Sequence, residues 1–196
     1  MLELLSEVIT LPATAHVHAA IVLDWYKRPT DDPDPTTWPN TEVGELVSRG
    51  KYNYRTRSHL QGMVGREIVG RMCRAIGRHP GIRATDVVLD VPGHDADQVS
   101  FAGRMAATVA RDVEKPFIRV MAGNSFRPPA KSADPEVRAQ AIRGRFSVGD
   151  SLSGMTALIV DDVFRSGESM RETARAAVVA GASLVYGICA VRTMRR

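Results

Sequence analysis

Two adjacent carboxylates, Asp161 and Asp162, follow the apolar run 157–160 and precede the polar segment 165–169, RSGES. Neighbouring carboxylates repel each other, so they need partners such as sugar hydroxyls, a cation or a basic side chain. We expect a strand to end at these acids and a helix to begin in the segment that follows. Unpaired amides at a helix N-terminus favour an anion, glycine permits close approach, and hydroxyls add donors. Acceptors for sugar hydroxyls beside donors for a phosphate suit a ribose 5-phosphate.

A purely structural role for the same residues is the alternative. The acids can cap the turn, and Ser166 or Ser169 can cap the helix. Capping accounts for one acid and one serine, but it leaves the second acid and the glycine-flanked turn without a reason. The phosphate-binding patterns GxxxxGK[ST] and GxGxxG do not occur in the sequence.

The rest of the chain alternates between strand-like and helix-like segments. Strands are expected at 16–25, 85–93, 116–121, 157–160 and 183–192, and amphipathic helices at 59–79, 98–113 and 166–181. This alternation predicts an α/β fold, a doubly wound parallel sheet flanked by helices. Ligands of such sheets bind beyond the carboxyl ends of the strands. Two segments are expected there: 161–169, with the two acids and the polar turn, and 90–95, DVPGHD.

Composition predicts one globular domain. The chain has 196 residues, 44% of them hydrophobic and 24% charged, which is ordinary for such a domain. No run approaches the roughly 20 apolar residues that cross a bilayer, and the acidic start MLELLSEVIT lacks the basic region of a signal peptide. We therefore expect a cytoplasmic protein. Cys73 and Cys189 lack CxxC spacing, which favours reduced thiols over a disulfide or zinc site.

Residues 157–169, ALIVDDVFRSGES, resemble the thirteen-residue signature of the type I phosphoribosyltransferases. That signature has four hydrophobic residues, two acids, a hydrophobic pair and a Thr/Ser-rich glycine loop. The resemblance implies that Asp161 and Asp162 bind the ribose 2- and 3-hydroxyls of phosphoribosyl pyrophosphate (PRPP). It also implies a 5-phosphate site at Arg165, Ser166, Gly167, Glu168 and Ser169.

A resemblance over most of the chain points to the ComF-like, competence-associated branch of that family. Its basis is a basic segment (49–57), a strand with a pyrophosphate loop (89–95) and an Arg-rich element (138–146). The resemblance implies a small N-terminal hood over about 1–58, a core over about 59–196 and a homodimer. It implies Mg2+ as cofactor, with Asp161 and Asp162 acting on the metal indirectly, through PRPP or water.

The sequence departs from the family pattern at several positions. Arg165 stands where Thr is usual, Glu168 where a small residue is more common, and Ala141 where the branch often has Asn. The expected pyrophosphate loop lacks the usual basic run, and the four-cysteine zinc segment of many ComF relatives is absent.

Transfer from PRPP expels pyrophosphate, so positioning and charge stabilisation should supply most of the rate. We expect the leaving group at the loop formed by Pro92, Gly93, His94 and Asp95. His94 can contact it or act as acid or base, but an ordinary exposed loop histidine is the alternative. The cationic candidates are Arg127, Lys131, Arg138 and Arg143.

Lys131 and Arg165 are the predicted catalytic residues. Lys131 lies in the polar segment 127–135, a candidate lid, although a solvated loop lysine is the alternative. Arginine cannot act as a base, because its side chain keeps its proton in proteins. The resemblance implies that this position of the loop lies close to the acceptor, so Arg165 favours an acidic or carbonyl-rich acceptor, or a pocket adapted to binding.

Two functions compete. The first is a Mg2+-dependent phosphoribosyltransferase (pentosyl glycosyltransferase) of nucleotide metabolism, which transfers ribose 5-phosphate from PRPP to a nitrogenous acceptor. The second is a non-catalytic PRPP- or nucleotide-binding protein, or a nucleic-acid-associated one, without a membrane partner. The tyrosines and basic residues of 51–57 suit single-stranded nucleic acid, the pyrophosphate of a neighbouring site, or a solvated face. The sequence does not identify the acceptor.

Overall fold

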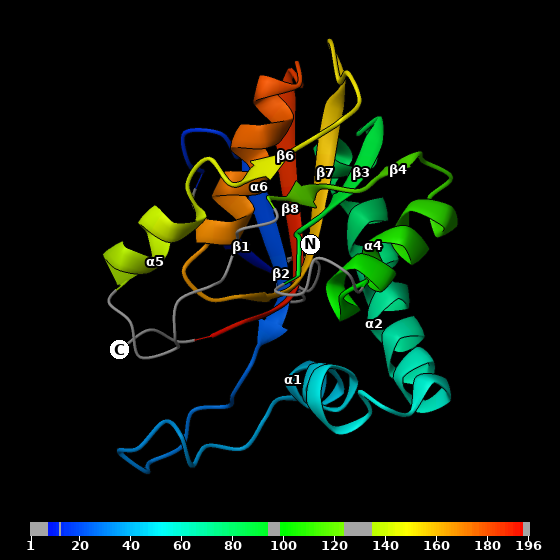
Figure 1. Ribbon diagram of the computed structural model, residues 1–196. Coiled ribbons are helices and arrows are strands. Elements are labelled where there is room, and N and C mark those ends of the chain that lie inside the picture. Colours follow the sequence, from blue (N-terminus) through cyan, green and yellow to red (C-terminus); the bar gives the residue numbers. More distant parts are fainter. Residues whose placement is uncertain (1–7, 12, 94–98, 124–134, 194–196) are drawn as a thin grey trace.

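The computed structural model describes residues 8–11, 13–93, 99–123 and 135–193, and within them the central sheet has the strand order β1-β2-β8-β7-β3-β4 (Figure 1). Neighbouring strands are parallel except β1, which is antiparallel to β2. The predicted α/β fold is thereby confirmed. The strands are β1 (Ile9–Leu11), β2 (Ala19–Trp25), β3 (Val87–Asp90), β4 (Phe117–Ile118), β7 (Thr156–Phe164) and β8 (Leu184–Arg192).

Helices cover both faces of the sheet, as expected for a doubly wound fold (Figure 1). One face carries α1 (Glu42–Ser48), the π-helical turn η2 (Arg49–Asn53), α2 (Ser58–Arg78), α3 (Pro80–Arg83) and α4 (Phe101–Asp112). The other face carries α5 (Pro135–Ile142) and α6 (Glu168–Val179). None of these helices within the described ranges combines the length and hydrophobicity of a transmembrane span.

The apolar run of β7 is buried on both faces because successive side chains of a strand point in opposite directions. Leu158 and Val160 pack into the core beneath α2 and α4. Ala157 and Ile159 pack into the core beneath α6. The strand does not end at the acids, as expected, but continues to Phe164, because β7 stays paired with β8 past them. The same alternation therefore places Asp161 and Asp162 on opposite sides of the sheet.

The chain leaves β3 and β7 in opposite directions, which makes their junction the topological switch point of the sheet. From β3 it passes through α4 to β4, and from β7 through α6 to β8. Asp90, the last residue of β3, pairs with Val160 of β7. The carboxyl ends of these two strands are therefore adjacent, in the place where open α/β sheets bind ligands.

The single strand predicted at 116–121 is wrong. The chain forms β4 and then β5 (Met121–Ala122), which pairs in a separate sheet with β6 (Phe146–Ser147). The break lies at Val120, whose amide donates a hydrogen bond to Asp90 Oδ1 instead of continuing the ladder. β6 is fixed to α6, because Arg175 contacts both Glu172 Oε1 (2.7 Å) and the Phe146 carbonyl (3.1 Å).

The segment expected to form a hood contributes directly to the sheet. β2 pairs with β8, with Ile21 opposite Ile188. The proline-rich segment that follows is exposed, as expected, and Lys27 Nζ fixes it by donating to the carbonyls of Thr36 and Trp38. The division of the chain into hood and core stays a prediction.

Candidate functional site

The turn 165–167 joins β7 to α6 through a backbone conformation that only glycine fits. Gly167 is the N-cap of α6 and has a φ of +77°, in the left-handed region. A β-carbon at Gly167 would also lie 2.8 Å from the Phe164 ring. Both the positive φ and the close ring therefore require glycine at this position. Gly167 has no side chain to cap α6, but Ser166 Oγ accepts a long hydrogen bond (3.5 Å) from the Glu168 amide, so capping accounts for Ser166 and not for Asp161 or Gly167.

A hollow of about 80 Å3 lies in this turn. A water molecule occupies about 30 Å3 in the liquid, so the hollow has room for a phosphate-sized group. Asp161 of β7 borders it together with both predicted serines and Arg165. The lining is Ile142, Asp161, Val163, Phe164, Arg165, Ser166, Gly167, Glu168, Ser169 and Met170.

Two charged side chains of the turn differ in their partners. Glu168 forms an ion pair with Arg171 one helical turn later. Its carboxylate is therefore engaged, while the first amides of α6 have no partner within the helix, as at any helix N-terminus. Arg165 is exposed and makes no hydrogen bond or ion pair among the described residues. Its charge therefore has no described partner at the hollow that it lines.

The two acids do not enter the same space. Asp161 is partly buried, lines the hollow and accepts a hydrogen bond from the Asp162 amide (2.8 Å). Asp162 is buried on the opposite face and is not among the lining residues described for the hollow. Its Oδ1 lies 2.8 Å from Lys51 Nζ of η2. The predicted joint contact of both acids with one ribose stays a prediction.

Burial and neighbouring charges shift the pKa values of Asp161 and Lys51. Burial raises the pKa of Asp161 to about 7; the Asp162 charge adds to the rise and Lys51 opposes it. For Lys51, burial acts to lower the pKa, but the adjacent Asp162 outweighs it and the net pKa is raised. Near neutral pH the pair of acids thus carries a charge that Lys51 compensates only in part.

η2, which carries Lys51, is held against α4 by complementary shape and hydrogen bonds. A β-carbon at Gly50 would lie 2.3 Å from the Phe101 ring, so glycine is required for this contact. Gln61 Nε2 donates to the Gly50 carbonyl (2.6 Å), and Arg104 donates to Gln61 Oε1 (2.7 Å). These contacts fix the backbone next to Lys51.

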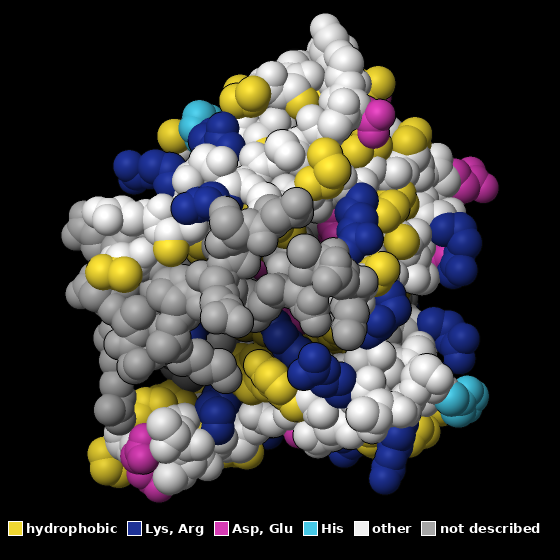
Figure 2. Space-filling model, in the orientation of Figure 1, with side chains coloured by type: hydrophobic (Ala, Val, Ile, Leu, Met, Phe, Trp, Pro, Cys, Tyr) yellow, Lys and Arg dark blue, Asp and Glu magenta, His cyan; other side chains and the backbone are white. Residues whose placement is uncertain are grey.

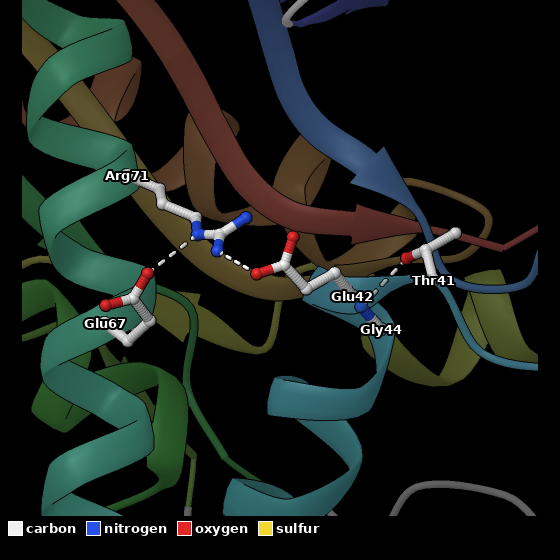
Figure 3. Close-up of polar contacts among 5 residues, drawn as sticks. All are labelled: Thr41, Glu42, Gly44, Glu67 and Arg71. Carbon is white, nitrogen blue, oxygen red and sulfur yellow. Dashed lines mark hydrogen bonds and ion pairs between the residues drawn. The ribbon is translucent and has the colours of Figure 1, made fainter.

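The helix before η2, α1, is held by a capping residue at its N-terminus and by an ion pair with α2 (Figure 3). Thr41 caps α1 by accepting a hydrogen bond from the Gly44 amide (3.0 Å). Arg71 of α2 reaches Glu67 on its own helix (3.0 Å) and Glu42 on α1. Because η2 continues directly from α1, these contacts also limit the movement of Lys51.

The end of β3 is arranged differently. Asp90 is buried, and its Oδ1 accepts a hydrogen bond from the Val120 amide (2.9 Å). Burial raises the pKa of Asp90, and the Val120 amide opposes the rise. Pro92 and Gly93 follow at the carboxyl edge and are partly buried. Their predicted companions in the pyrophosphate loop, His94 and Asp95, lie outside the described residues.

Of the remaining predicted cations, Arg143 alone has a described side chain, and it is not among the described residues that line the hollow. Lys131 and Arg127 lie outside the described residues, as does the side chain of Arg138. Arg143 is exposed and follows Ile142, which lines the hollow. Among the described residues, no group of three or more His, Cys, Asp or Glu side chains is arranged to hold a metal ion.

Basic side chains are more prominent than acidic ones on the face shown in Figure 2, in keeping with the net charge of +4. Within the basic segment, Arg55 and Arg57 are exposed. Tyr52 is exposed as well, but Tyr54 packs against the core. The segment therefore presents one open tyrosine instead of a pair, which weakens its fit to stacked nucleic-acid bases.

Sequence reasoning missed two residues, Lys51 as the partner of Asp162 and Asp90 as the acceptor for Val120. A signal for the first was available: the alternation of β7 places Asp162 on the face of Leu158 and Val160, where a buried acid needs a cation. A signal for the second was an acid closing a buried strand, Val87–Asp90.

No protein-family model matches this sequence, and no curated protein matches it. Solved structures with partial similarity include a purine phosphoribosyltransferase from Pyrococcus horikoshii, with 13% identity, a TM-score of 0.43, and coverage of 66% of this chain and 81% of that one. Another is orotate phosphoribosyltransferase from Aeropyrum pernix, with 17% identity, a TM-score of 0.42, and coverage of 67% and 59%. A third is phosphoribosylpyrophosphate synthetase from Mycobacterium smegmatis, with 18% identity, a TM-score of 0.41, and coverage of 64% and 33%.

Proposed function

We propose that this protein is a phosphoribosyltransferase that uses PRPP and Mg2+ to transfer ribose 5-phosphate to a nitrogen nucleophile. One observation carries the proposal: Asp161 and the glycine turn 165–169 line the same hollow at the switch point of the sheet. An acceptor for a sugar hydroxyl and donors for a phosphate are thus neighbours, as a ribose 5-phosphate requires. The likeness of residues 157–169 to the family signature supports the same ligand.

In this proposal the 5-phosphate binds at the N-terminus of α6. The first amides of the helix, the hydroxyls of Ser166 and Ser169, and the positive end of the helix dipole favour an anion there. Gly167 allows the backbone to approach the phosphate closely. Asp161 accepts from a ribose hydroxyl, and ionised Asp161 is the better acceptor.

Mg2+ fits this site when it binds together with PRPP. Mg2+ prefers carboxylate, water and phosphate oxygens, and Asp161 offers such an oxygen, whereas Asp162 is already paired with Lys51. We therefore assign Asp161 and Asp162 an indirect contact with the metal, through PRPP oxygens or water. A bound Mg2+ supplies charge neutralisation of the departing pyrophosphate.

The protein's own part in the transfer is positioning and electrostatic stabilisation. Arg165, exposed at the hollow, is proposed to contact the acceptor and to favour one that is acidic or rich in carbonyls. Lys131 keeps its proposed role in stabilising the reacting groups. An Arg165→Ala variant should change the preference among acceptors, and unchanged preference would contradict the role of Arg165.

Isothermal titration with PRPP tests the binding half of the proposal. The wild type should bind PRPP only with Mg2+, and Asp161→Asn/Asp162→Asn should weaken binding by about 100-fold or more, because the charged acceptor at the hollow, Asp161, is lost together with the indirect metal contact of Asp162. Asp150→Asn removes an exposed carboxylate elsewhere and is the matched control. No binding at millimolar PRPP would overturn the proposal.

A second function, binding without turnover, is favoured by the ion pair between Lys51 and Asp162, because it occupies one of the two acids. Release of pyrophosphate from PRPP, measured over a panel of bases and amines, separates the two functions. Turnover with any acceptor supports the enzyme. Mg2+-dependent binding with no turnover, or salt-sensitive DNA binding alone, supports the second function.

A further inference from the structure

Lys51 pairs with an acid of β7, and the residue before it packs against the start of α4. Its ammonium is 2.8 Å from Asp162 Oδ1 at the end of β7. Its neighbour Gly50 packs against Phe101, the first residue of α4. The chain reaches α4 from Pro92 and Gly93, the described part of the expected pyrophosphate loop. Lys51 is therefore beside the helix into which that loop leads.

The two faces of β7 each offer positive charge. On the face of α6, the helix N-terminus and Arg165 border the hollow. On the face of α4, Lys51 pairs with Asp162. PRPP carries a phosphate at one end of its ribose and a pyrophosphate at the other. A ribose placed over the end of β7, with its 5-phosphate in the hollow, directs the pyrophosphate toward the face of Lys51.

We propose that Lys51 binds the pyrophosphate of PRPP within its own chain, with Asp162 as the residue that orients it. This inference rests on the proposed function. The Lys51 side chain is 35% exposed, whereas that of Asp162 is 6% exposed. An ammonium has three donors, so Lys51 can keep its bond to Asp162 and still donate to a phosphate oxygen. Lys51 thus supplies a cation that the segment 92–95 lacks.

The surroundings of Lys51 suit such a role because they fix it before a ligand arrives. The Gly50 carbonyl is bound by Gln61, and Gln61 is bound by Arg104 of α4. Asp162 holds the ammonium end of the side chain. A cation fixed at both its backbone and its ammonium loses little freedom on binding, which strengthens binding.

Isothermal titration of the full chain with three probes tests the assignment: PRPP, ribose 5-phosphate and inorganic pyrophosphate, each with Mg2+. Lys51→Met should weaken PRPP and pyrophosphate binding by about tenfold or more, because a charged hydrogen bond is lost. Ribose 5-phosphate lacks the group that Lys51 contacts, so its affinity should change by less than about twofold. Lys51→Arg should restore part of the lost affinity.

Two further variants separate binding from folding. Arg55→Met removes an exposed cation from the same segment and should leave all three affinities within about twofold of the wild type. Lys51→Met leaves Asp162 buried without its partner and can unfold the chain. Lys51→Met/Asp162→Asn removes both charges, and this folded variant should lose pyrophosphate affinity as Lys51→Met does.

The outcomes distinguish this inference from the proposed function. Equal loss of all three probes in a folded Lys51 variant, or unchanged pyrophosphate affinity, overturns the assignment of Lys51. A wild type that binds pyrophosphate through Lys51 but not PRPP overturns the proposed function and supports Lys51 as a site for free pyrophosphate. A wild type that binds none of the probes overturns both. Restored PRPP binding on mixing Lys51→Met with Asp161→Asn places Lys51 in a neighbouring chain and overturns the assignment within one chain.

Discussion

Aspartates lie at the last position of β3 and within the last four residues of β7, near the same edge of the sheet, but they have different partners. Asp90 closes β3 and gives its Oδ1 to the buried Val120 amide. Among the described residues, Asp161 accepts a hydrogen bond only from the amide of the next residue, and it lines a hollow. Asp162 draws its partner, Lys51, from a distant part of the chain. The carboxylate of β3 is held by a backbone amide from a neighbouring element, whereas Asp161 of β7 borders a hollow.

This comparison indicates how to tell a structural acid from a binding acid. An acid whose oxygens are taken by backbone amides of neighbouring elements should matter to stability and little to binding. An acid beside a hollow should matter to binding and cost stability, because its charge is poorly compensated. Four substitutions test this distinction, from the largest expected effect on stability to the smallest.

Gly167→Ala should have the largest effect, because it forces a positive φ on alanine and drives its β-carbon against the Phe164 ring. We expect a loss of about 3 kcal/mol in the free energy of unfolding, together with weaker PRPP binding. Gly154→Ala is the matched control, since Gly154 has a φ of +75° but open space around it. It should cost about 1 kcal/mol. Equal losses in urea unfolding would show that the ring contact is unimportant.

Asp90→Ala should destabilise the protein by about 2 kcal/mol, because the Val120 amide is left buried without an acceptor. Asp90→Asn keeps an oxygen in place and should cost less than about 1 kcal/mol. Urea unfolding measures both values. If the alanine variant is as stable as the asparagine variant, the bond from Asp90 to Val120 does not hold the end of β3.

Asp161→Asn should change how stability depends on pH. The native pKa of Asp161 is raised to about 7, so the stability that this raised pKa contributes is lost as pH rises through 7. The variant avoids this loss and should be more stable than the wild type by about 1 kcal/mol at pH 8, with the difference shrinking toward pH 5. Urea unfolding at both pH values, with Asp150→Asn as control, measures it. A difference that does not vary with pH contradicts the prediction.

Ser169→Ala should have the smallest effect on stability, within about 0.5 kcal/mol, because the hydroxyl that contacts the start of α6 is that of Ser166 and the Ser169 hydroxyl makes no hydrogen bond among the described residues. PRPP binding should weaken by about threefold to tenfold through the loss of one hydroxyl donor. Thermal unfolding and titration measure the two effects. A loss of about 1 kcal/mol with unchanged PRPP affinity would instead support the capping role.

Much of the fold was predictable because it depends on local patterns. The period of apolar residues placed the long helix at 59–79, and α2 spans Ser58–Arg78. The continuous apolar run before Asp161 gave β7 its two buried faces. By contrast, β4, β5 and β6 have two residues each, too few for any period to be visible. Their positions depend on tertiary contacts, such as the bond between Asp90 and Val120.

The candidate site was predictable only in the part that is contiguous in sequence. The turn 165–169 and Asp161 come together because they are neighbours along the chain. Lys51 joins Asp162 across 111 residues, and no local pattern specifies such a pair. The roles predicted for Lys131, His94 and Asp95 concern positions outside the described residues and stay predictions.

The pairing of β2 with β8 has a consequence for the order of folding. Ala19 lies opposite Tyr186, so β2 cannot take its place beside β8 until synthesis has passed residue 186. Contacts so distant in sequence carry a high loop-closure entropy and form slowly. During synthesis the N-terminal segment must wait with apolar residues exposed, which invites aggregation. Lys51 and Asp162 should therefore meet late, and ligand-binding competence should be among the last properties that the folding chain acquires.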